Sequence, residues 1–130
     1  MKKKILLDID EVFCFSGYLE LVNEFLGTDY KIDDFSDYYI DEVAIPKDKK
    51  AEFYKFASTK DQYANPVILP GAIEAISLLS KYYDIYPCSD CRNPFDLKNS
   101  GCIFKSKFEM LYRLIPEEVI PAKNYIFTGA

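Results

Sequence analysis

The sequence predicts an α/β fold in which a parallel sheet is flanked by helices. Apolar segments of strand character alternate with segments of helical period, an order typical of parallel sheets covered by helices. Polar residues also stand where the predicted strands end: Asp8 and Asp10 at the first, Ser89 at the second and Thr128 at the third. Because ligand sites in such sheets lie at the carboxyl ends of strands, these residues predict a site at one sheet edge.

The first predicted strand spans residues 4–9 and ends in the sequence Asp-Ile-Asp. Alternate residues of a strand point the same way, so the carboxylates of Asp8 and Asp10 are expected on one side. Two crowded acids are costly unless a cation or a proton offsets their charges. The pair therefore indicates divalent metal binding with nucleophilic chemistry. The alternative is a buried strand followed by an acidic turn.

Two helices are predicted after the first strand. Tyr and aliphatic residues at helical spacing predict a helix over 17–26, capped by Ser16 and ended by Gly27. The acidic and aromatic stretch 28–45 shows no clean period. A proline then opens a second helix over 47–57.

The rest of the chain continues the alternation. The expected elements are a connector over 58–69, a helix starting at Pro70-Gly71, a strand over 83–88, a polar loop over 90–103, an amphipathic helix over 104–115 and a strand over 124–128. The apolar stripe of the last helix is predicted to consist of Phe104, Phe108, Leu111, Tyr112 and Ile115.

Composition restricts the class of protein. A chain of 130 residues that is 49% hydrophobic suits one globular domain. Its net charge of −5 argues against a nucleic acid polymer as partner, although a single phosphate ester held with a metal remains compatible. No apolar run reaches membrane-spanning length, and Lys2, Lys3 and Lys4 do not begin a secretory signal. We expect a cytoplasmic protein without a membrane partner.

The four cysteines do not predict a metal centre. Cys88 and Cys91 form a C-x-x-C motif, which is found in zinc and redox sites. A zinc site would need two more ligands, but histidine is absent and Cys14 and Cys102 have no second C-x-x-C spacing. We interpret all four as reduced thiols.

The first motif, Leu-Leu-Asp-Ile-Asp-Glu-Val over residues 6–12, resembles that of the haloacid dehalogenase-like (HAD) phosphohydrolases, and Ser89 matches the second. Further stretches over 32–38, 69–72 and 124–129 resemble the 5′(3′)-deoxyribonucleotidases across essentially the whole chain. The resemblance implies a HAD-like (Rossmann-like) core over 1–16 and 68–130. Residues 17–67 would form a small helical cap inserted after the first strand.

The resemblance also implies a Mg²⁺-dependent hydrolysis of (deoxy)nucleoside monophosphates. Asp8 would attack phosphorus and form an aspartyl phosphate. Asp10 would protonate the leaving oxygen and later deprotonate water. Mg²⁺ would be bound by Asp8 and the backbone carbonyl of Asp10, and Ser89 would orient the phosphoryl oxygens. Glu11 stands where the family often has glycine, and its role stays open.

Further substrate contacts are assigned to Asp90, to Phe35 in the cap and to Lys105 on the helix after Ser89. Phe35 would stack on a nucleobase, with packing inside the cap as the alternative. Lys105 or Lys107 would approach the phosphate, with a solvated helix face as the favoured alternative.

Members of the family also use a lysine shortly after the Phe-Thr-Gly stretch and an acidic pair beyond it, and the sequence ends at Ala130. We expect either a partial form of a longer protein, with weak Mg²⁺ affinity and negligible turnover, or a degenerate relative that binds nucleotide or phosphate without turnover. A receiver-type phosphoacceptor domain and a non-enzymatic interaction domain are the remaining alternatives. The sequence leaves the base, the sugar, the position of the phosphate and a homodimer open.

Overall fold

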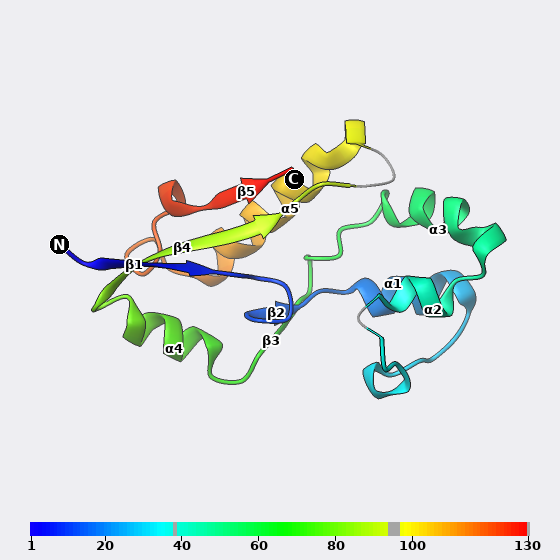
Figure 1. The fold of residues 1–130 in the computed structure, drawn as a ribbon, viewed down its shortest axis with the longest axis horizontal. Coiled ribbons are helices and arrows are strands. Elements are labelled where there is room, and N and C mark those ends of the chain that lie inside the picture. The colour runs from blue at the N-terminus through cyan, green and yellow to red at the C-terminus, as the bar shows by residue number, and fades with distance from the viewer. Residues whose placement is uncertain (38, 94–96, 130) are drawn as a thin grey trace.

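The structure, a computed structural model, describes residues 1–37, 39–93 and 97–129. Its centre is a parallel sheet of three strands in the order β1 (Lys3–Leu7), β4 (Tyr83–Asp90) and β5 (Ile126–Thr128) (Figure 1). The predicted α/β fold with a parallel sheet flanked by helices is confirmed. Three parts of the chain lie outside the described residues: Tyr38 in the predicted aromatic stretch, residues 94–96 in the predicted polar loop, and Ala130 after the predicted closing strand.

Two helices pack on the sheet, α4 (Ala72–Leu79) and α5 (Ser100–Leu114). They bury apolar side chains against the strands, and this burial is the main source of stability for such a layer. The shared core contains Ile76 of α4, Ile85 of β4 and Met110 and Leu111 of α5, all 5% exposed or less. This core therefore joins both helices to the strands of the sheet.

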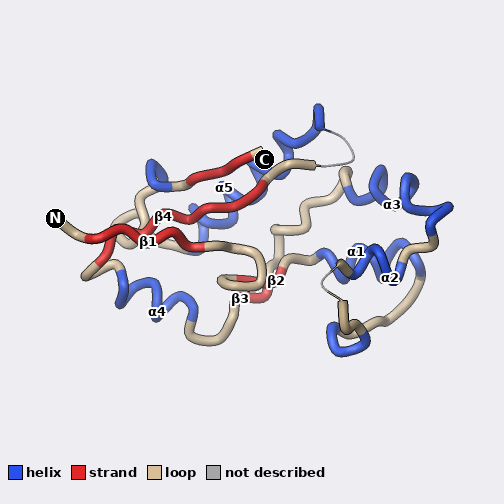
Figure 2. The backbone as a smooth tube through the Cα atoms, in the orientation of Figure 1, coloured by secondary structure: helices blue, strands red, loops and turns tan. Residues whose placement is uncertain are grey.

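A second packed region lies beyond the carboxyl ends of β1 and β4, as the tube in Figure 2 shows. It consists of α1 (Tyr18–Leu26), α2 (Ile40–Ala44) and α3 (Lys50–Ala57), with single 3₁₀ turns at Ile32–Asp34 and Lys47–Lys49. Phe53 is fully buried there and meets Tyr18 and Phe25 edge-on, with ring centroids 5.8 and 5.4 Å away. Such edge-to-face pairs add to the stability that burial supplies. We call residues 18–57 the helical segment.

A short pair of antiparallel strands lies where the chain enters and leaves this region. Strands β2 (Cys14–Phe15) and β3 (Val67–Ile68) pair with Cys14 opposite Ile68. The Leu69 amide also donates to the carbonyl of Phe13 at 3.0 Å, and the Gly17 amide to the carbonyl of Gln62 at 2.7 Å. The chain thus leaves the core and returns to it at one place. The sequence predicts only a connector over 58–69, where the structure has the returning strand β3.

Of the two predicted ends of the first helix, the glycine that ends it is confirmed and the serine that caps it is not. Helix α1 ends at Gly27, whose φ of 69° is the left-handed conformation that favours glycine. The predicted cap by Ser16 is wrong, because Gly17 occupies the N-cap and the Ser16 hydroxyl instead donates to Gln62 Oε1 at 3.4 Å. The buried face of α5 also differs from the predicted stripe, since Phe108 is 41% exposed.

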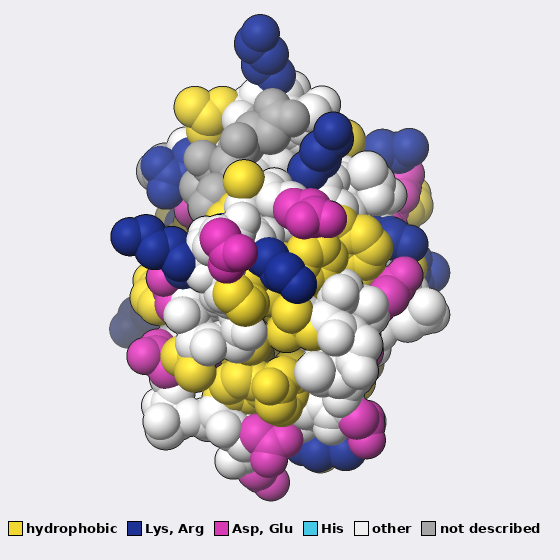
Figure 3. Space-filling model, turned by 90° about the vertical axis from the view of Figure 1, so that its right-hand side faces the viewer, with side chains coloured by type: hydrophobic (Ala, Val, Ile, Leu, Met, Phe, Trp, Pro, Cys, Tyr) yellow, Lys and Arg dark blue, Asp and Glu magenta, His cyan; other side chains and the backbone are white. Residues whose placement is uncertain are grey.

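Figure 3 shows the end of the molecule that carries the helical segment. Apolar side chains gather in the middle of this face, and acidic and basic side chains of both signs surround them. None of the helices within residues 1–37, 39–93 and 97–129 combines the length and apolar character needed to cross a membrane.

Candidate functional site

The two predicted acids follow β1 in a tight turn. The strand ends at Leu7, and the carbonyl oxygen of Ile9 accepts hydrogen bonds from the amides of three later residues, Val12, Phe13 and Cys14, at 2.9–3.3 Å. Glu11 adopts a φ of 62°, which is uncommon for a residue with a Cβ and marks a constrained turn. Ile9 stands between Asp8 and Asp10, and its side chain is fully buried, so it anchors the turn that carries both acids to the core.

A buried lysine lies at the centre of the polar groups. Lys107 of α5 is 2% exposed, and its Nζ donates to Asp10 Oδ2 at 2.7 Å. The same ammonium group donates to Ser89 Oγ at 2.6 Å and to the backbone carbonyl of Asp90 at 2.7 Å. Buried cations are found where they are paired and hydrogen-bonded, and these three acceptors satisfy that requirement. The cluster thus joins the turn after β1, the end of β4 and the middle of α5.

The lysine also determines the direction of the Ser89 hydroxyl. An ammonium group has three donors and no acceptor, and all three are used by Asp10, Ser89 and Asp90. Because Ser89 Oγ accepts from Lys107, its own hydrogen is available to another acceptor. Within the cluster that acceptor is Asp10 Oδ2, at a long 3.5 Å. An oxyanion bound next to Ser89 would offer its hydroxyl a closer hydrogen-bond acceptor.

Tyr63 connects the cluster to the return from the helical segment. Its hydroxyl donates to Asp10 Oδ1 at 2.7 Å, and its ring lies 5.2 Å from Lys107 Nζ. The Arg113 guanidinium holds the backbone of this stretch through the carbonyls of Tyr63 and Ala64, at 3.4 and 3.2 Å. Burial, together with the charge of Asp10, raises the pKa of Tyr63. The phenol therefore stays a hydrogen-bond donor to Asp10 at neutral pH.

The other predicted site residues lie around this cluster. Asp8 is exposed, and its Oδ1 accepts from the Ile9 amide at 2.7 Å. Asp90 reaches Lys107 through its backbone, while its carboxylate accepts from the Arg92 amide at 2.8 Å. Phe35 is partly buried, meets Tyr30 edge-on and lines a smaller hollow of about 380 Å³.

Lys105 does not join the cluster. Its side chain is 76% exposed and lies 3.9 Å from Glu109 on the surface of α5. For Lys107, the predicted solvated helix face is wrong. A sequence signal for Lys107 existed: it precedes the buried Met110 and Leu111 by three and four residues, so it belongs to the buried face of the helix.

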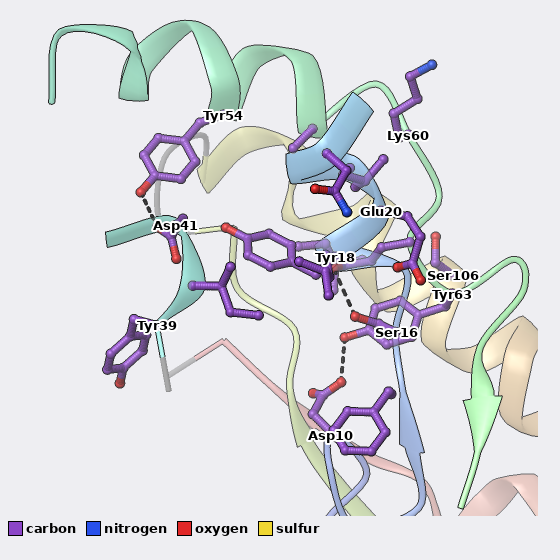
Figure 4. A pocket seen from close by; sticks show the side chains of 18 of the residues that line it. Asp10, Ser16, Tyr18, Glu20, Tyr39, Asp41, Tyr54, Lys60, Tyr63 and Ser106 are labelled. Atoms are coloured by element: carbon purple, nitrogen blue, oxygen red, sulfur yellow. Dashed lines mark hydrogen bonds between the residues drawn. The ribbon is translucent and has the colours of Figure 1, made fainter. Parts of the chain in front are cut away.

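A cavity of about 910 Å³ extends from Asp10 into the helical segment. Asp10 and Tyr63 line one end, and Asp41 and Tyr54 line the other, with Tyr18 between them (Figure 4). The volume lies within the range of small-molecule sites, roughly 300–1,000 Å³. The candidate site is therefore a polar cluster at the strand ends, of which Asp10 and Tyr63 also line a chamber under the helices.

The thiols contribute no further centre. All four cysteines are free, and within the described residues no group of three or more Cys, His, Asp and Glu side chains is arranged to hold a metal. Burial raises the pKa of Cys14 and of Cys91 to about 11, so both stay protonated at neutral pH. This protonation is typical of structural thiols and not of reactive ones.

Comparison with known proteins does not assign the chain to a family. No family model matches it, and the search of curated proteins finds no matching relative.

Proposed function

We propose that this protein is a Mg²⁺-dependent phosphomonoester hydrolase of the HAD-like type that acts on deoxynucleoside monophosphates. The observation that carries the proposal is the buried ammonium group of Lys107, bonded to Asp10 and Ser89 beside a cavity of about 910 Å³. A fixed positive charge next to a serine hydroxyl at strand ends is suited to hold a phosphate group.

The chain's own residues would have distinct tasks. Asp8, exposed at the strand end, is the nucleophile: its carboxylate oxygen forms a bond to phosphorus as the bond to the leaving nucleoside oxygen breaks. Asp10 in its protonated form gives its proton to that oxygen, and the resulting carboxylate, which is the state that pairs with Lys107, later takes a proton from the water that hydrolyses the aspartyl phosphate. Ser89 donates its hydroxyl hydrogen to a phosphoryl oxygen, and Lys107 supplies positive charge beneath it.

The oxygen donors fit a magnesium ion held by few protein ligands. Magnesium keeps several waters and is often bound by one or two carboxylates together with substrate phosphate. Asp8 offers an exposed carboxylate and Asp10 a backbone carbonyl, and no three acidic side chains converge in the described part of the chain. The bound ion would neutralise charge on the phosphate and on the attacking carboxylate. These two residues are the ones that would hold it.

A second function remains a candidate, because Asp10 already accepts hydrogen bonds from both Lys107 and Tyr63. An acid held in this way is well suited to organise a phosphate site without transferring protons. The chain would then bind nucleotide or phosphate without turnover.

Turnover separates the two functions. Phosphate release from dUMP and from p-nitrophenyl phosphate is measured with Mg²⁺, with EDTA as control. Hydrolysis that EDTA abolishes, and that Asp8→Asn removes while inorganic phosphate still binds, supports the hydrolase. Phosphate binding without release supports the binding protein. Normal hydrolysis by Asp8→Asn would refute the proposed nucleophile, and absence of both binding and release would refute both functions.

A further inference from the structure

The end of the cavity farthest from Asp10 carries a second polar cluster, built from all three helices of the helical segment. Asp41 of α2 is 8% exposed, and its Oδ2 accepts a hydrogen bond from the Tyr54 hydroxyl of α3 at 2.5 Å. Tyr18 of α1 lies near enough for the charge of Asp41 to contribute, after burial, to the raised pKa of its phenol. All three residues line the cavity, and Figure 4 shows Asp41 and Tyr54 facing each other there.

Asp41 is a buried acid supported by neutral donors. No lysine or arginine forms an ion pair with it in the described ranges. Burial, together with the Asp41 charge, raises the pKa of Tyr18, and burial and the hydrogen bond to Asp41 raise that of Tyr54, so both phenols stay donors at neutral pH. A carboxylate accepts about four hydrogen bonds, so the bond from Tyr54 leaves capacity for donors of a ligand.

We propose that Asp41 binds the N–H edge of a guanine base, so that the chain prefers guanine nucleotides. This inference rests on the proposed function, because the phosphate of such a ligand would lie at the Asp10 end of the same cavity. Guanine presents two neighbouring donors, N1–H and the 2-amino group, which match the two oxygens of one carboxylate. Uracil and thymine present one N–H between two carbonyls, and their carbonyl oxygens repel a carboxylate.

The surroundings of Asp41 suit a flat aromatic ligand. Tyr18, Tyr39 and Tyr54 line the chamber, and aromatic side chains stack on nucleobases. A buried carboxylate is costly in an apolar chamber, and donors from a ligand would offset that cost. Asp41 thus determines which base enters, while Asp10 and Lys107 act only on the phosphate.

The test uses nucleosides, which have no phosphate, so that its outcome is separate from that of the proposed function. Binding of deoxyguanosine, deoxyinosine and deoxyuridine to the whole chain is measured by titration calorimetry. Deoxyinosine keeps N1–H but lacks the 2-amino group. We expect deoxyguanosine to bind about tenfold more tightly than deoxyinosine and deoxyuridine to bind weakest, since hydrogen bonds to a charged acceptor are strong. Equal affinities, or no nucleoside binding, would overturn the inference.

The variant Asp41→Asn should shift the preference from deoxyguanosine toward deoxyuridine. The amide oxygen still accepts from a tyrosine, while the amide NH₂ can donate to a base carbonyl, so affinity for deoxyguanosine should fall by about tenfold or more and that for deoxyuridine should rise. Asp48→Asn is the matched control, because Asp48 is an exposed acid of the same segment. If Asp41→Asn keeps the wild-type order of affinities, the inference is wrong. Inorganic phosphate should bind equally well to wild type, Asp41→Asn and Asp48→Asn. If wild type does not bind phosphate, the proposed function is refuted instead.

Discussion

Replacing Lys107 by methionine tests the centre of the site most directly. Methionine keeps the length and apolar character of the lysine stem, so the helix packing is largely preserved while the ammonium group is lost. The variant leaves Asp10 without the cation 2.7 Å away, and Ser89 and the Asp90 carbonyl without their donor. The perturbation is therefore mainly electrostatic.

The expected loss follows from the burial of the two partners. Breaking a fully buried ion pair costs about 3–5 kcal/mol, because one charge is left in a poor solvent. Here Lys107 is 2% exposed but the Asp10 side chain is 34% exposed and keeps its hydrogen bond from Tyr63. Water can thus hydrate part of the carboxylate, and burying a lysine charge is itself costly. We expect Lys107→Met to lower the free energy of unfolding by about 2 kcal/mol.

Urea denaturation measures this loss, and the chain offers a matched control. Lys105→Met is the same substitution two residues earlier in α5, where the lysine is 76% exposed and 3.9 Å from Glu109. Such surface pairs contribute about 0–1 kcal/mol, so this variant should be close to wild type. In an Asp10→Asn background, Lys107→Met should cost less, with a coupling energy of about 1–2 kcal/mol. Equal losses for the two lysine variants, or no coupling to Asp10, would refute the buried ion pair.

Two further predictions concern backbone conformation and thiol ionisation. Gly71 has a φ of 78°, so Gly71→Ala should lower the free energy of unfolding by about 1 kcal/mol, whereas Gly101→Ala, in open space on α5, should be neutral or stabilising in the same urea assay. At pH 8, iodoacetamide should modify the exposed Cys102, whereas the buried Cys14 and Cys91, whose pKa burial raises to about 11, should stay unmodified by mass spectrometry. A raised pKa favours the protonated thiol in the folded state. This stability is fully present below the ordinary pKa of 9.0 and is lost as the pH rises through about 11. The urea concentration at the midpoint of unfolding should therefore fall between pH 9.0 and about 11. A constant midpoint would contradict the raised pKa of the two buried thiols.

The elements that the sequence predicted are those with a local signal. Helix α1 (Tyr18–Leu26) has an apolar stripe at helical spacing and ends at a glycine, and both features act within a few residues. The strand that became β4 is rich in aromatic and aliphatic residues, and its buried residues Ile85, Pro87 and Ser89 alternate with partly buried ones, as the period of a strand predicts. Such signals need no knowledge of the rest of the chain.

The missed features depend on contacts between distant residues. The β2–β3 pair has two residues on each side, and Cys14 meets Ile68 only because the intervening chain folds back. Tyr63 lies in a connector without periodicity, yet it bonds Asp10 across 53 positions of sequence. The sequence favours a surface position for Lys107, because charged residues are seldom buried. Its three acceptors come from two other parts of the chain. Only the assembled fold brings these acceptors to one point.

The position of Lys107 also changes the argument for a metal. In the sequence alone, the repulsion between Asp8 and Asp10 indicates a divalent cation, but in the structure a lysine at 2.7 Å offsets the charge of Asp10. The need for a metal then comes from a different repulsion, that between the Asp8 carboxylate and an incoming phosphate dianion. Mg²⁺ should accordingly bind weakly to the protein alone and more tightly when inorganic phosphate is present, and phosphate should gain affinity by the same factor. Titration calorimetry in both orders measures this coupling. Independent binding of the two ions would show that Mg²⁺ and phosphate do not share the site at Asp8.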